Sequence, residues 1–109
     1  MKSRLEFDGD DVENKNEVYV AITSPLEKSA VYLDFRLNVE ISSYYDVEGI
    51  NIYLDGEKVA DDDNEPFGYS FSLPASKIGS HEIEVTAKNE KDDKGSDKIQ
   101  FELRGYAKE

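Results

Sequence analysis

The sequence predicts an all-β domain in which two antiparallel sheets pack face to face, with about seven strands. Apolar and polar residues alternate in several short segments, which is the period of strands with one buried face. Polar turns separate these segments at intervals of roughly 8–12 residues, and no long segment shows helical spacing. A closed barrel is the alternative architecture. The 109 residues are 38% hydrophobic, with seven Tyr and five Phe, which suffices for one domain with a real core.

The first half of the chain contains two predicted strands. Residues 18–22 alternate Val, Tyr, Val, Ala and Ile, and Pro25 ends this strand because it cannot donate to a sheet ladder. We expect it at a sheet edge. Residues 31–41 carry the clearest alternation, and a strand places six apolar side chains of this segment on one face. These six residues are Val31, Leu33, Phe35, Leu37, Val39 and Ile41.

A β-hairpin is predicted over residues 50–59. Asp55 and Gly56 tolerate the positive φ that a two-residue turn requires. With this loop length, Ile52 lies opposite Val59 on the inner face, and Tyr53 lies opposite Lys58 on the outer face.

The second half of the chain predicts three more strands, over residues 67–73, 81–87 and 99–103. Residues 74–79 form a short helical turn that buries Ile78 under the sandwich. The connecting loops span residues 42–49, 61–66 and 89–97. Residues 1–16 are too polar to bury much surface and are expected to be a flexible acidic tail or linker. The predicted domain spans residues 17–104, and residues 105–109 form a C-terminal tail.

Charge and cysteine content exclude several classes of function. The net charge of −12 repels nucleic-acid phosphates and anionic lipid, so neither is an expected partner. Without cysteine the chain has no disulfide, no thiolate nucleophile and no zinc–thiolate site. No apolar run reaches the length of a signal peptide or of a membrane span.

Antiparallel alternation gathers acidic residues at one end of the sandwich. The segment before residue 18 and the loops 42–49, 61–65 and 88–97 all emerge there. Carboxylates from several loops can supply the six to eight oxygens that calcium prefers. The predicted calcium ligands are Asp46, Glu48, Asp61, Asp63, Asp92 and Asp93, with Asp10, Asp11, Asp62 and Glu65 at the same end. The favoured alternative is a solvated acidic rim without cofactor, because no loop has an EF-hand pattern.

Three further residues are candidates for a binding or catalytic site. Tyr44 and Tyr45 can stack on a sugar ring or a partner surface, although one of them can instead pack over the end of the core. His81 is the only histidine, and it is expected to be structural. Ser80 is its neighbour, but adjacent strand side chains point to opposite faces, so the two cannot act together. No cleft or phosphate-binding glycine loop is evident, and we expect no enzymatic activity.

Four motifs follow one another along the chain: Thr-Ser-Pro at 23–25, the Asp-Gly hairpin at 52–59, Pro66-Phe67 before a strand, and Gly-x-His-x-Ile-x-Val-x-Ala at 79–87. Their order resembles that of prokaryotic immunoglobulin-like modules, including fibronectin type III-like ones. The resemblance implies an immunoglobulin-like β-sandwich over about residues 17–104. It also implies an extracellular or cell-envelope location, with neighbouring domains, a protein or a glycan surface as partners.

Two functions are therefore expected from the sequence. The first is a non-catalytic spacer or adhesion module of a larger surface protein. The second is a calcium- or carbohydrate-binding accessory domain that uses the acidic end and the two tyrosines Tyr44 and Tyr45.

Overall fold

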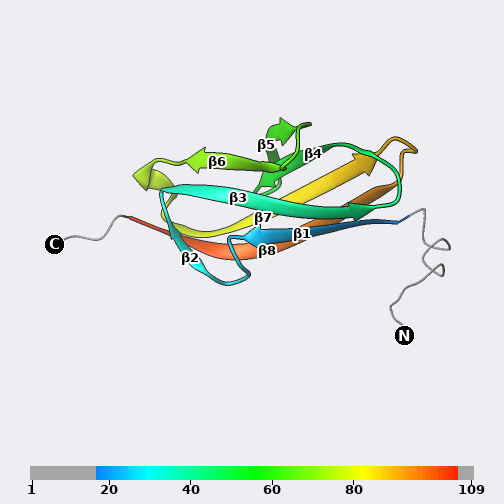
Figure 1. Cartoon of the computed structure of the whole chain (residues 1–109). Coiled ribbons are helices and arrows are strands. Elements are labelled where there is room, and N and C mark those ends of the chain that lie inside the picture. Colours follow the sequence, from blue (N-terminus) through cyan, green and yellow to red (C-terminus); the bar gives the residue numbers. More distant parts are fainter. Residues whose placement is uncertain (1–16, 106–109) are drawn as a thin grey trace.

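The computed structural model describes residues 17–105, which form two sheets that lie face to face (Figure 1). The three-stranded sheet has the order β1 (Val18–Ser24), β3 (Asp34–Ser43), β6 (Gly68–Ser72). The five-stranded sheet has the order β2 (Ala30–Tyr32), β8 (Lys94–Arg104), β7 (Gly79–Asn89), β4 (Val47–Leu54), β5 (Glu57–Asp62). A 3₁₀ turn, η2 (Ala75–Lys77), precedes β7. The predicted sandwich is confirmed. Among residues 17–105, the strands pair antiparallel except for β2 with β8, which are parallel.

The core lies between the two sheets and is built from the alternating residues of both. Leu37, Ile52, Ile83 and Leu103 are fully buried at its centre. Because successive strand residues point to opposite faces, the polar residues between them lie on the outer surfaces. In the described part of the chain, no helix is long and apolar enough to cross a membrane.

The apolar run 31–41 faces the interior as predicted, but it does not form one strand. Val31 belongs to β2 and pairs with Leu103 in the five-stranded sheet, whereas Phe35 belongs to β3 and pairs with Phe71 in the other sheet. The chain crosses between the sheets at Leu33, which still packs against the core. The predicted single strand is therefore two strands, β2 and β3, one in each sheet.

The β4–β5 hairpin has a different register from the predicted one. Tyr53 lies opposite Lys58, as expected, but Ile52 lies opposite Ala60 and not Val59. A bulge between these pairs leaves Val59 43% exposed. A bulge places two residues against one on the partner strand, so the side that Val59 faces cannot be read from alternation alone.

Two predictions near the ends of strands are wrong. Ile78 is 51% exposed and not buried under the sandwich, because η2 is a single turn at the end of the molecule. The loop expected at 89–97 is much shorter. Strand β7 continues to Asn89 and β8 begins at Lys94.

The described chain enters at one end of the sandwich and leaves at the other (Figure 1). Strand β1 starts beside the end of β3, where Val18 lies opposite Ser43. A Cβ on Gly95 would lie 1.9 Å from the Val18 carbonyl oxygen, so the main chain of β1 rests directly on β8 at this point. The ends of the described chain are therefore opposed, as the strand count predicts. The predicted tails, 1–16 and most of 105–109, lie outside the described residues.

Candidate functional site

The two predicted binding tyrosines lie together in the turn between β3 and β4. Their rings meet edge to face, with centroids 5.0 Å apart. Tyr45 is partly buried, and the Lys91 ammonium lies 5.2 Å from the centre of its ring. Tyr44 is 63% exposed. Tyr45 thus packs against Tyr44 and Lys91, while the Tyr44 side chain is largely exposed.

Two of the predicted calcium ligands, Glu48 and Asp92, share one lysine near these tyrosines. Lys88 Nζ lies 3.5 Å from Glu48 Oε1 and 3.5 Å from Asp92 Oδ1. The main chain of Asp46 accepts a hydrogen bond from the Glu90 N–H (2.8 Å), which ties the β3–β4 turn to the β7–β8 turn. The Lys88 ammonium therefore lies between the carboxylates of Glu48 and Asp92.

Of the remaining predicted ligands, Asp61 lies on β5 and Asp63 directly follows that strand. Asp61 pairs with Lys58 at 3.4 Å on the same strand. Asp61 and Asp63 line a shallow hollow of about 250 Å³ together with Glu48 and Lys88. Among residues 17–105, no group of three or more acidic or histidine side chains has an arrangement that could hold a metal ion. Calcium binding stays a prediction, and Asp10 and Asp11 lie outside the described residues.

Asn89 organises this end of the molecule, and sequence reasoning missed it. Its side chain is fully buried. Its Oδ1 accepts from the N–H groups of Lys91 (2.9 Å) and Asp93 (3.0 Å), and its Nδ2 donates to Ser43 Oγ (3.1 Å) and Asp93 Oδ2 (3.3 Å). An asparagine followed by charged residues resembles a loop in composition. Only the tight turn that follows β7 shows why the amide is needed.

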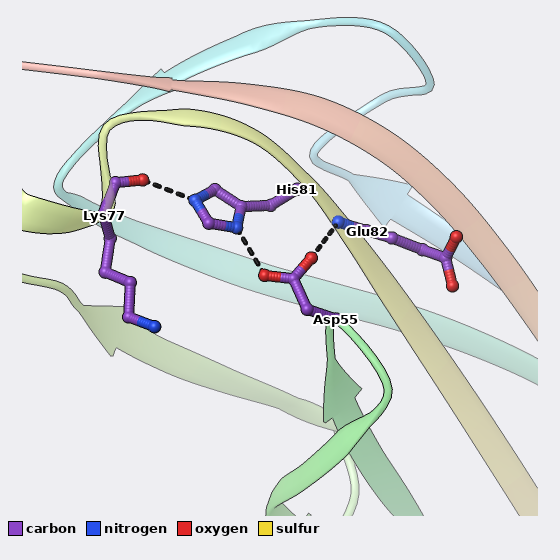
Figure 2. A network of polar contacts seen from close by, with 4 residues as sticks. All are labelled: Asp55, Lys77, His81 and Glu82. Carbon is purple, nitrogen blue, oxygen red and sulfur yellow. Dashed lines mark hydrogen bonds and ion pairs between the residues drawn. The ribbon is translucent and has the colours of Figure 1, made fainter.

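A second polar network, drawn in Figure 2, lies at the opposite end of the sandwich. His81 Nδ1 lies 2.5 Å from Asp55 Oδ2, and His81 Nε2 contacts the Lys77 carbonyl oxygen. The other carboxylate oxygen of Asp55 accepts from the Glu82 N–H (2.9 Å). His81 therefore connects the β4–β5 turn to η2.

The electrostatics of Asp55 follow from these contacts. Burial acts to raise the pKa of its carboxyl group, but the hydrogen bonds from His81 and from the Glu82 N–H outweigh it and lower the pKa from 3.8. Both ring nitrogens of His81 are engaged with acceptors, so neither is free to activate the exposed Ser80. The network holds a turn in place, which agrees with the structural role expected for His81.

Comparison with known proteins identifies the fold family. The sequence profile of the bacterial Ig domain matches residues 19–85. A search of curated proteins found no match.

The fold is shared with several solved structures. The fibronectin(III)-like modules of CbhA from Clostridium thermocellum superpose with a TM-score of 0.68 at 24% identity over 82% of this chain. The endo-beta-1,4-mannanase from Thermotoga petrophila gives 0.66 at 12% identity over 83%, and a Jonesia denitrificans lytic polysaccharide monooxygenase gives 0.57 at 11% over 73%. The matches cover 47%, 20% and 60% of those chains, so this chain corresponds to part of each. From the profile match and the sandwich together, the chain belongs to the bacterial Ig domain family.

Proposed function

We propose that this domain is a non-catalytic spacer within a larger surface or secreted bacterial protein. The observation that carries the proposal is the placement of the chain ends. Val18 starts at one end of the long strands and Arg104 finishes at the other (Figure 1). Domains linked before and after such a module are held apart by the length of the sandwich, as a spacer requires.

Contacts of the segments around β1 and β2 with β8 support a role under tension. Strand β2 runs parallel to β8, and the Glu102 N–H donates to the Ser29 carbonyl oxygen (2.8 Å). Further along, the Ile22 N–H donates to Asp97 Oδ2 (2.9 Å). Hydrogen bonds between strands lie across the strand direction. A pull on the two chain ends therefore shears these bonds together and does not open them one at a time.

Single-molecule pulling tests this proposal. The chain contains no cysteine, so the substitutions Glu17→Cys and Gly105→Cys provide unique handles at the two ends of the described domain. We expect one cooperative unfolding step that releases roughly 300 Å of chain, from about 3.5 Å for each extended residue.

A second handle pair provides the control. Glu57→Cys combined with Gly105→Cys pulls across the five-stranded sheet, because Glu57 lies on the edge strand β5 and is level with Ile99 of β8 through the pairing of Leu54 with Ile83. That geometry peels strands from the sheet edge and should unfold at lower force. If the end-to-end pull unfolds at the same force or in several weak steps, the spacer proposal is wrong.

A second candidate function is contact with a glycan through Tyr44. Its 63% exposure, and the fixed position that Tyr45 gives it, support a stacking contact. Two of the structural neighbours are named as a mannanase and a polysaccharide monooxygenase. Binding to a panel of immobilised polysaccharides should be lost in Tyr44→Ala and retained in Tyr32→Ala, which removes a tyrosine that is 47% exposed elsewhere. Equal retention by both variants would reject this function.

A further inference from the structure

Among the described residues, one side of β3 has no neighbouring strand along the last residues of β3. Strand β6 pairs with β3 only from Asp34 to Asn38, whereas β1 pairs with β3 as far as Ser43. Within residues 17–105, no strand pairs with the β6 side of residues 40–43. The edge of the three-stranded sheet that β6 forms therefore stops short, and a gap follows it beside residues 40–43 of β3.

The backbone groups at this gap can be assigned from the hydrogen bonds beside it. The Leu33 carbonyl oxygen accepts from Leu73 N–H (2.9 Å), and the Val39 N–H donates to the Phe67 carbonyl oxygen (3.3 Å). Odd-numbered residues of β3 thus direct their main-chain groups towards β6. Because this direction alternates along a strand, the N–H and C=O of Ile41 and the N–H of Ser43 face the gap. They form a short edge that is ready for pairing.

A hollow with an apolar base and an acidic rim lies at the same gap. It measures about 530 Å³ and is lined by Val39, Glu40, Ile41, Glu65, Pro66 and Phe67. The side chains of Val39 and Phe67 belong to the core, whereas Glu40 and Glu65 are exposed. The hollow can therefore take an apolar side chain from an occupant whose neighbouring residues are basic.

The charge of the molecule discriminates between occupants. A second copy of this chain would bring its own acidic rim and a net charge of −12 against Glu40 and Glu65, which is repulsive. A basic segment has the opposite effect. We propose that the gap beside Ile41 binds an extended segment of a partner protein that alternates apolar and basic residues and adds to the sheet as a strand. Its main chain pairs with Ile41 and Ser43, an apolar side chain enters the hollow, and basic side chains face the rim.

A peptide titration of the full chain tests the proposal. The probe is acetyl-Lys-Val-Lys-Val-Lys-Val-amide, followed by amide NMR. We expect the amide resonances of Ile41 and Ser43 to shift and their hydrogen exchange to slow, because both N–H groups become hydrogen-bonded. A peptide with Glu in place of each Lys should not bind. Equal binding of both peptides, shifts confined to other strands, or no shift at millimolar probe would overturn the proposal.

Variants separate the edge from general electrostatics. Glu65→Lys should weaken binding by about fivefold, which is the scale of one exposed charge contact. The control Glu57→Lys makes the same charge change at the β4–β5 turn and should have little effect on binding. Ile41→Pro removes the N–H that faces the gap and should abolish binding. Glu65→Lys leaves the main chain unchanged, so it decides the question if Ile41→Pro fails to fold.

Two other occupants would give different results, and either would overturn the proposal. If Ile41 shifts with protein concentration in the absence of peptide, a second copy fills the gap. If the probe binds only after residues 1–16 are removed, the chain's own N-terminal segment competes for it.

Discussion

Replacement of Asn89 by alanine should destabilise the domain strongly, because this side chain makes four hydrogen bonds from a fully buried position. The substitution leaves the N–H groups of Lys91 and Asp93 without their acceptor and removes both donors of the amide. At roughly 1 kcal/mol for each hydrogen bond, we expect a loss of about 2–4 kcal/mol in the free energy of unfolding. That is a large part of the 5–15 kcal/mol typical of a domain.

Urea denaturation followed by circular dichroism measures this loss. The control is Asn64→Ala, which removes an exposed loop amide. Its Nδ2 donates to Asp63 Oδ1 (3.3 Å), and the substitution should change the free energy of unfolding by less than about 0.5 kcal/mol. Asn89→Asp adds a second test. It keeps the acceptor but places a carboxylate beside Asp93, so its stability should improve as the pH falls and that group is protonated. If Asn89→Ala costs no more than Asn64→Ala, the argument from the buried amide is wrong.

Three further predictions concern the turn network, the junction of β1 with β8, and the core. The lowered pKa of Asp55 means that its contribution to stability is present above pH 3.8 and is lost as the pH falls below it. The free energies of unfolding of the wild type and Asp55→Asn should therefore converge at low pH. Because the carboxyl group is 45% exposed, the two free energies should differ by less than about 1 kcal/mol at neutral pH. A difference that does not change with pH would contradict this prediction. Gly95→Ala should cost more than about 2 kcal/mol in thermal melts, since its Cβ cannot fit 1.9 Å from the Val18 carbonyl oxygen; an unchanged melting temperature would show that β1 can move away. Leu37→Ala should cost about 2–5 kcal/mol by urea denaturation, because the side chain is fully buried, and a smaller loss would mean that the core collapses around the cavity.

The fold was accessible from the sequence because alternation reports directly which side chains are buried. The run from Val31 to Ile41 predicted its inner face correctly at every apolar position. It did not reveal the crossing between sheets at Leu33, since the alternation continues through the crossing. The Val59 bulge was hidden for a related reason. An extra residue in one strand becomes visible only when the partner strand is known.

The candidate site was less accessible, because it depends on contacts between turns. Tyr44 and Tyr45 were identified from composition, but their edge-to-face contact depends on how the β3–β4 turn bends. Asn89 was assigned to a loop because the residues after it are polar, whereas its burial depends on a turn that folds back onto its side chain. Asp55 was chosen for its turn conformation, and the histidine that contacts it lies 26 positions further along the chain.

The hydrogen bond between Ile22 and Asp97 also has a consequence for how the domain acquires its fold. The two residues are 75 positions apart in the sequence. Closure of so long a loop is slow relative to local strand pairing. During synthesis, β1 cannot make this bond until Asp97 of β8 has left the ribosome. The contact of β1 with β8 therefore forms late in folding, and a truncation before Asp97 would leave the Ile22 N–H without this acceptor, although β1 would keep its pairing with β3.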